Sequence, residues 1–116
     1  MSNGNLNANG TYALIGYLTA SESVKTFTDG TYRYLYLELC VDSSETKVVA
    51  STFIPMSMID NRTVASDIIM QGTRVLSGGA TFSAGASVKV SKNMIQLVSP
   101  YSNTWTFYRI QCYGIK

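Results

Sequence analysis

The sequence predicts an all-β protein, an antiparallel β-sandwich of jelly-roll-like type with roughly seven to nine strands. Three observations favour this fold. Apolar and polar residues alternate with a period of two along nearly every segment, turn residues recur about every ten positions, and helical periodicity is almost absent. The length of 116 residues suits a single domain. We place this domain at 11–116, after a flexible polar N-terminal segment at 1–10 that is rich in Asn and Gly.

The first three strands are expected within residues 12–41. The first covers 12–18, with its even-numbered residues on one face. The second covers 24–28 and ends at Asp29-Gly30, which is a strong signal for a hairpin turn. The third, 32–41, is the clearest, because Leu and Val occupy its odd positions after Arg33 and a Tyr-rich set occupies its even ones. We therefore expect one face of this strand on the core and the other facing outward or toward a partner.

The rest of the chain continues the same pattern. A strand at 47–54 reaches Pro55, which indicates a sheet edge or a strand end, and 56–59 would continue it beyond a bulge. Segment 66–71 fits either a strand or one turn of helix. A turn is expected at 100–103. The later predicted strands are 74–76, 86–90, 94–98 and 104–113.

The composition excludes several kinds of chemistry. Histidine is absent, so neither a Ser-His-Asp triad nor a His-ligated zinc site can form. The net charge is +2 and the basic residues are scattered, so we expect no nucleic-acid partner. No apolar run approaches the roughly 18 residues of a membrane span, so no membrane insertion is expected. Cys40 and Cys112 lie in apolar runs and are expected as buried free thiols, with a disulfide only if their strands are neighbours.

Tyr32, Tyr34 and Tyr36 alternate along the third predicted strand and would share its outer face. We predict that this run lies in a subunit interface, because Tyr is enriched in interfaces. A second layer of the core and a ligand-stacking face are the alternatives.

A second candidate site lies around the predicted turn at 100–103. Tyr101 and Trp105 flank this turn, and Asn103 could supply the polar groups that a sugar needs. We predict saccharide binding at Tyr101, Asn103 and Trp105, and the alternative is that the Trp is a core or interface anchor. No motif positions a general base, so no enzyme is expected, and neither a metal nor another cofactor is expected.

The final stretch, Trp105 to Lys116, ends in Tyr-Gly-Ile-Lys and resembles the C-termini of phage tail-fibre and baseplate receptor-binding proteins. Three upstream segments resemble the same group in the same order, and together they cover most of the chain from residue 30 onward. They are the strand 34–41, the segment 53–59 and the hairpin 88–97.

This resemblance implies a β-sandwich head in the virion tail, assembled in the host cytoplasm. Such heads are usually homotrimers that contact other virion proteins and the host surface, often a saccharide. The expected function is therefore non-enzymatic recognition of a host surface by three weak sites acting together. The alternatives are a structural decoration or assembly module without a host ligand, and a small lectin-like domain.

Overall fold

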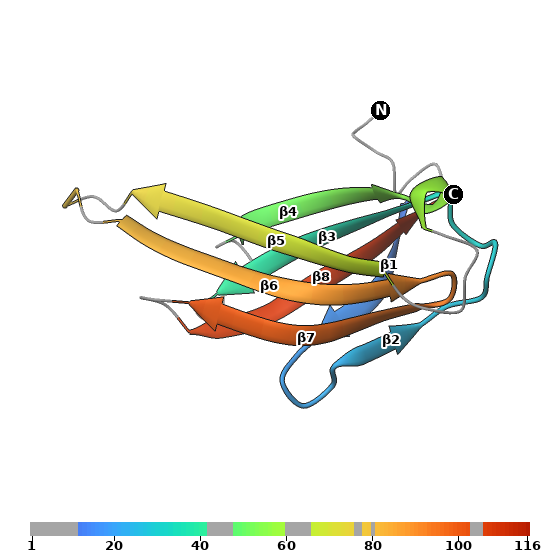
Figure 1. The fold of residues 1–116 in the computed structure, drawn as a ribbon, viewed down its shortest axis with the longest axis horizontal. Coiled ribbons are helices and arrows are strands. Elements are labelled where there is room, and N and C mark those ends of the chain that lie inside the picture. Colours follow the sequence, from blue (N-terminus) through green and yellow to red (C-terminus); the bar gives the residue numbers. More distant parts are fainter. Residues whose placement is uncertain (1–11, 42–47, 60–65, 76–77, 80, 103–105) are drawn as a thin grey trace.

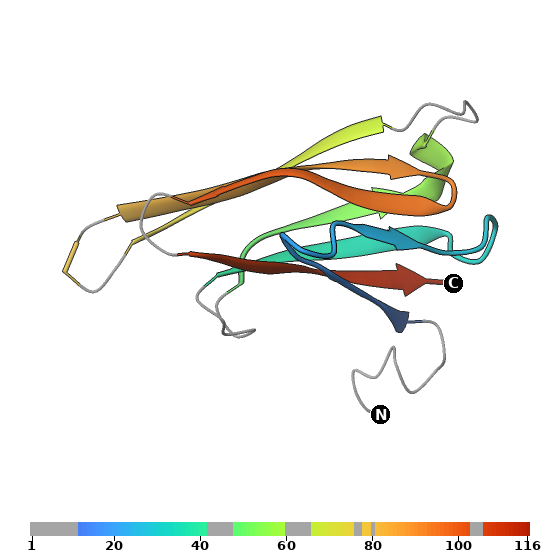
Figure 2. The same cartoon turned by 90° about the horizontal axis from the view of Figure 1, so that it is seen from below.

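The computed structural model describes residues 12–41, 48–59, 66–75, 78–79, 81–102 and 106–116, and these form a sandwich of two antiparallel sheets (Figure 1). The elements are β1 (Tyr12–Leu18), β2 (Val24–Thr26), β3 (Tyr34–Val41), β4 (Val48–Pro55), a 3-10 helix η1 (Met56–Met58), β5 (Ser66–Val75), β6 (Thr81–Ser91), β7 (Met94–Ser102) and β8 (Phe107–Ile115). Figure 2 shows the two sheets as stacked layers. The predicted β-sandwich is confirmed, with eight strands in the described residues.

The strand order is β1-β8-β3-β4 in one sheet and β2-β7-β6-β5 in the other. In a jelly roll the first, eighth and third strands are neighbours in one sheet, and the second and seventh are neighbours in the other. The same neighbours occur here, so the fold is jelly-roll-like. In a complete jelly roll the fourth and sixth strands would each lie in the opposite sheet. Here β4 returns directly along β3, and β6 lies between its chain neighbours β5 and β7.

The core lies between the inner faces of the two sheets. On β3 the alternation holds as predicted, since Leu35, Leu37 and Leu39 are all fully buried. Inward side chains from β6, β7 and β8 complete this layer, including Val88 and Ile95. Each fully buried aliphatic side chain contributes about 1.5–3 kcal/mol of hydrophobic stabilisation, and such residues come from both sheets.

The connection at Asp29-Gly30 is a turn, with the Thr31 amide donating to the carbonyl of Thr28 at 3.1 Å and Gly30 at φ 88°. It is not the hairpin that the sequence predicted. β2 pairs with β7 in one sheet, whereas β3 pairs with β4 and β8 in the other. The turn therefore carries the chain from one layer to the next.

Two further expectations are corrected near prolines. Residues 56–59 do not continue β4, because η1 begins directly after Pro55 and the Ile59 amide donates to the Met56 carbonyl at 3.0 Å. Pro100 does not begin a turn, because it pairs with Ala86 inside β7. β2 pairs with β7 only as far as Gln96, and in the described residues no strand lies beside the rest of that β7 edge. Pro100 lacks a backbone N–H, so it is tolerated at this unpaired edge.

The first strand also differs from its predicted pattern. A bulge between Leu14 and Gly16 shifts the pairing of β1 with β8. As a result Leu14 is 50% exposed while Leu18 is fully buried, so the even-numbered residues do not share one face. Segment 66–71, which was ambiguous, is part of the strand β5.

Candidate functional site

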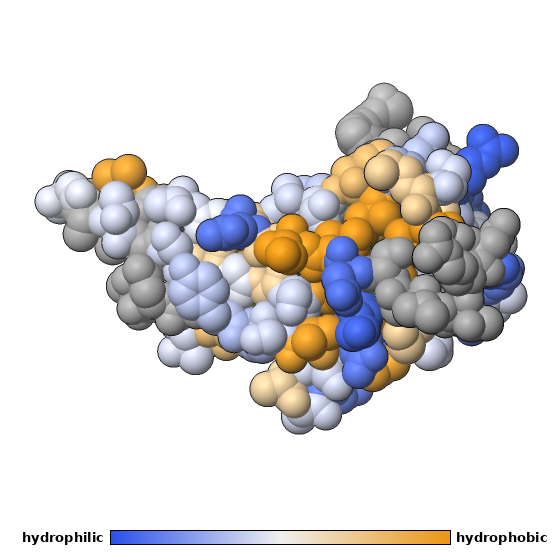
Figure 3. All heavy atoms as spheres, viewed as in Figure 1, coloured by the Kyte–Doolittle hydropathy of each residue, from blue (hydrophilic) through white to orange (hydrophobic). Residues whose placement is uncertain are grey.

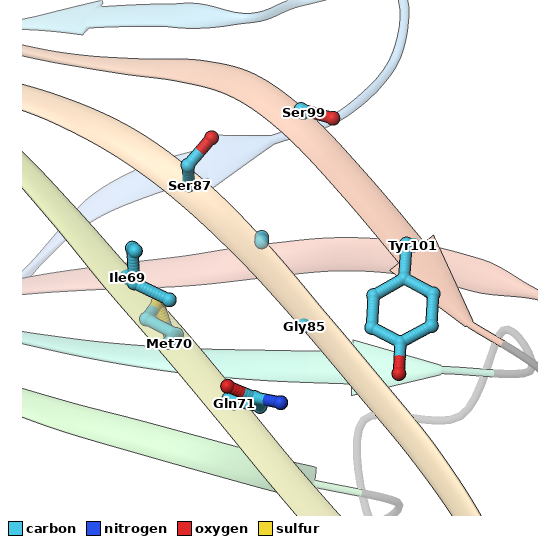
Figure 4. Close-up of a pocket in the computed structure, with 8 residues that line it drawn as sticks. Ile69, Met70, Gln71, Gly85, Ser87, Ser99 and Tyr101 are labelled. Atoms are coloured by element: carbon cyan, nitrogen blue, oxygen red, sulfur yellow. The ribbon is translucent and has the colours of Figure 1, made fainter.

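A shallow groove lies on the outer face of the β2-β7-β6-β5 sheet, around Tyr101 (Figure 4). The register builds it from two cross-strand rows. One row joins Gln71 of β5, Gly85 of β6 and Tyr101 of β7, and the next joins Ile69, Ser87 and Ser99 in the same strand order. We call these six residues the Tyr101 groove.

The missing side chain at Gly85 makes the floor of the groove. A Cβ placed there would lie 3.5 Å from Tyr101 Cε1, so the tyrosine ring already covers the space above the glycine backbone. Tyr101 is 50% exposed and Ile69 75% exposed, which leaves an aromatic and an aliphatic side chain standing on opposite sides of the floor. A ring over a strand glycine also protects the backbone from water, so the contact has a structural role as well.

The chemistry of the Tyr101 groove suits a neutral, hydroxyl-rich ligand. Its lining combines the Tyr101 ring with the Gln71 amide and the hydroxyls of Ser87 and Ser99, and no charged side chain contributes. Its volume is about 260 Å³, somewhat below the roughly 300–1,000 Å³ of drug-sized sites, which suits about one sugar ring. The nearest charges on this face in register are the exposed ion pair of Lys89 with Asp67 at 3.6 Å, one row further along.

Of the three predicted ligand residues, the structure places Tyr101 in this groove. Asn103 and Trp105 lie outside the described residues. Gln71, Gly85, Ser87 and Ser99 were not anticipated, because their proximity to Tyr101 depends on the pairing of β5, β6 and β7. The alternation of β5 puts Ile69 and Gln71 on one face, but nothing local to the sequence says which strand lies beside them.

The outer face of the other sheet carries a row of apolar and aromatic side chains. Pairing places Phe53 of β4, Tyr36 of β3, Tyr113 of β8 and Leu14 of β1 side by side. The rings of Tyr36 and Tyr113 are 6.2 Å apart. We call these four residues the aromatic row. Phe53 and Leu14, at its two ends, are about half exposed.

A polar cluster lies next to the aromatic row on the same face. The Gln111 side chain is almost fully buried and donates from Nε2 to Glu38 Oε1 at 3.0 Å and to the Tyr113 hydroxyl at 3.1 Å. Its Oε1 accepts from Arg109 Nη2 at 2.8 Å. The Arg109 guanidinium carbon lies 3.8 Å from the centre of the Tyr17 ring, which is within the range of a cation–π contact. Gln111 thus links the Arg109 guanidinium to the Glu38 carboxylate.

Tyr36 belongs to both arrangements, because its hydroxyl donates to Glu38 Oε2 at 3.2 Å. Partial burial raises the pKa of the Tyr36 phenol, and the Glu38 carboxylate adds to the rise. The phenol therefore stays protonated and keeps this bond at neutral pH.

The predicted run of Tyr32, Tyr34 and Tyr36 does not form one surface. Tyr34 and Tyr36 lie on the outer face of β3, whereas Tyr32 precedes the strand and packs on the core edge. Its ring meets Phe27 edge-on at a centroid distance of 5.7 Å and covers the backbone of Gly114. Tyr32 is therefore partly buried against the core, whereas the exposed Tyr34 and the half-buried Tyr36 share the outer face of β3. Their place in a subunit interface stays a prediction.

Both cysteines are buried thiols that form no disulfide, as the sequence predicted. Burial raises the pKa of the Cys112 thiol to about 12, so it is unreactive at neutral pH. Among the residues that the structure describes, no group of three His, Cys, Asp or Glu side chains could hold a metal ion. In the same part of the chain, no helix has the length and apolarity to cross a membrane.

The class of protein is defined by its fold alone, an antiparallel β-sandwich with jelly-roll-like strand pairing. No family model matches the chain, and neither a curated protein nor a solved structure matches it.

Proposed function

We propose that this protein is a non-enzymatic head domain of a phage tail fibre or tail tip, which binds a host-surface saccharide as a homotrimer. The observation that carries the saccharide part is the Tyr101 groove, where one ring, one amide and two hydroxyls meet over the Gly85 backbone without any charged lining. An exposed ring suits the C–H face of a sugar, and the amide and hydroxyls suit its hydroxyl groups.

The location in a virion tail rests on the resemblance of the C-terminal strand and the three ordered upstream segments. In that setting the partners are other copies of the chain, other virion proteins and the host surface. Three shallow grooves on one head would bind a repetitive surface glycan through effective concentration, which removes the need for a deep pocket.

The direct test is saturation-transfer NMR of the full chain with a panel of neutral hexose and N-acetylhexosamine oligosaccharides. We expect transfer to at least one of them, and Tyr101→Ala should weaken that binding about tenfold, the loss of roughly 1.4 kcal/mol of stacking and burial. Tyr101→Phe is the matched control, since it keeps the ring. Retained binding in Tyr101→Ala would place the ligand elsewhere.

The runner-up is a structural decoration or assembly module without a host ligand. The aromatic row favours a protein contact on the opposite sheet, which both functions share. The absence of binding to every neutral saccharide and to host cells, combined with stoichiometric incorporation into particles, would favour the structural module.

A further inference from the structure

The strand register sets the outline of the Tyr101 groove. The groove crosses three neighbouring strands, β5, β6 and β7, and two rows of residues. Neighbouring strands lie about 4.8 Å apart, and successive residues on one face of a strand lie about 7 Å apart, so the outline measures roughly 10 Å by 7 Å. One pyranose ring with one small substituent has a similar extent. The groove therefore has room for a single substituted sugar unit.

The Tyr101 ring offers one face to a ligand. A Cβ at Gly85 would lie 3.5 Å from Tyr101 Cε1 and 3.6 Å from Cδ1, so the ring rests over the glycine backbone. Figure 4 shows the broad face of the ring turned away from the strands. A pyranose can therefore stack on this outer face through its C–H groups.

An aliphatic side chain stands at the opposite corner of the groove. Ile69 lies diagonally across from Tyr101, on β5 and in the other row, and its side chain is mostly exposed. Figure 3 shows this sheet from outside, with hydrophobic residues beside weakly hydrophilic ones over β5, β6 and β7. A sugar hydroxyl gains nothing from an aliphatic neighbour, whereas a methyl group on the sugar would bury apolar surface against Ile69.

The polar side chains of the groove are not engaged with the rest of the fold. Within the part of the chain that the structure describes, Gln71, Ser87 and Ser99 make no side-chain hydrogen bond. The Gln111 amide on the other sheet, in contrast, both donates and accepts within its own cluster. Gln71 follows Ile69 by two residues on β5, so both side chains lie on one face. An amide with free donors and a free acceptor therefore stands next to an exposed aliphatic side chain.

We infer that the Tyr101 groove prefers a 2-acetamido sugar, an N-acetylhexosamine, over the parent hexose. The pyranose ring stacks on Tyr101, the acetamido N–H and C=O bond to the Gln71 amide, and the acetamido methyl group contacts Ile69. These three parts of the ligand follow one another in the order of the three side chains around the groove. A 6-deoxyhexose also carries a methyl group, but no amide lies between its ring and that methyl group. This inference rests on the saccharide binding in the proposed function and adds the chemical class of the sugar.

Saturation-transfer NMR titrations of the full chain with four methyl glycosides test this preference, namely those of N-acetylglucosamine, N-acetylgalactosamine, glucose and galactose. We expect at least one acetamido sugar to bind about tenfold more tightly than its parent hexose, with about fourfold from the buried methyl group and the rest from hydrogen bonds to Gln71. Ile69→Ser should reduce this ratio about fourfold and leave hexose binding within twofold. Val75→Ser, at an exposed aliphatic position of the same strand outside the groove, is the matched control and should keep the ratio.

The outcomes separate this inference from the proposed function. Equal binding of both acetamido sugars and their parent hexoses would overturn the preference and leave saccharide binding in place. Tighter binding of methyl fucoside, a 6-deoxyhexose, would do the same. An unchanged ratio in Ile69→Ser would also overturn the inference, because the methyl group would then lie elsewhere. Failure of every sugar to bind would overturn the proposed saccharide binding together with this inference. Ile69 and Val75 are both exposed, so both variants should fold, which circular dichroism checks.

Discussion

Gly72 on β5 lies directly against the backbone carbonyl of Val49 on β4, and the space between them holds no side chain. This contact joins the edges of the two sheets on one side of the sandwich, although the two strands belong to different ladders. An apolar pocket adjoins the same pair of strands, with Phe53 on β4 and Ile68 on β5 among its lining residues. The absence of a Cβ at position 72 therefore sets how closely the sheets approach beside the pocket.

Gly72→Ala should lower the free energy of unfolding by about 1–3 kcal/mol, the usual cost of forcing extra volume into a packed site. The obstacle is backbone rather than a flexible side chain, so the strands must separate to accept the methyl group. Urea unfolding measures the change. Gly78→Ala is the matched control, because a Cβ at Gly78 would meet nothing within 4 Å. Equal stability of the two variants would contradict the close approach of β4 and β5.

Gln111→Leu should destabilise the protein by about 1–3 kcal/mol, because it removes hydrogen bonds from partly buried polar groups. The variant removes the acceptor for Arg109 and the donor to Glu38 while keeping the side-chain size. A double-mutant cycle with Glu38→Gln, read by chemical denaturation, should give a coupling energy above 0.5 kcal/mol in magnitude, as is typical of residues in one network. Gln71→Leu, at an exposed position on β5, should change stability little. Additive effects at positions 38 and 111 would argue against the network.

Cys112 should make the protein less stable at alkaline pH. The native thiol keeps its proton up to a pKa of about 12, whereas in the unfolded chain the proton leaves near 9.0. Between these values the unfolded state binds fewer protons, so the free energy of unfolding falls as pH rises, by up to about 1.4 kcal/mol per unit. Thermal unfolding of the native chain and Cys112→Val between pH 8 and pH 11 should show a shallower decline in the variant. Parallel declines would mean that this thiol is not the cause.

Replacing both Tyr34 and Tyr36 with Ser should lower the oligomeric mass from about three chains toward the 12.7 kDa of one. The Tyr34 ring stacks on Phe53, at one end of the aromatic row, with a centroid distance of 5.0 Å, and Tyr36 is itself part of that row. Light scattering measures the mass and circular dichroism the fold. Tyr101→Ser on the other sheet should leave the mass unchanged. An unchanged mass in the folded double variant would remove these tyrosines from the interface.

The core of this fold was predictable where one strand alone carries the signal. On β3 every second residue from Leu35 to Val41 is apolar and buried, so periodicity was sufficient to identify its inner face. The same reasoning was wrong for Leu14, because the bulge before Gly16 changes which face the following residues occupy. A bulge adds a residue without changing the local composition, and the alternation in the sequence does not reveal it.

The candidate site was predictable only in part. Tyr101 stood out as an aromatic residue near a proline, but its neighbours Gln71 and Gly85 are brought to it by strand pairing across long stretches of chain. Pro100 predicted a turn because proline usually interrupts a strand. It is tolerated inside β7 because β2 ends before reaching it, and the sequence does not reveal where β2 ends. Tyr32 has the spacing of Tyr34 and Tyr36, yet it precedes the strand and turns onto Gly114. Each of these outcomes depends on tertiary context rather than on local preference.

The burial of both native thiols has a practical consequence for distance measurements. The sequence holds only Cys40 and Cys112, and both are fully buried, so neither should react with a maleimide probe in the folded protein. A cysteine introduced at an exposed position such as Val98 would then be the single labelled site of each chain. Spin or fluorescent labels there would report the spacing between copies directly, in a background that needs no prior removal of cysteines.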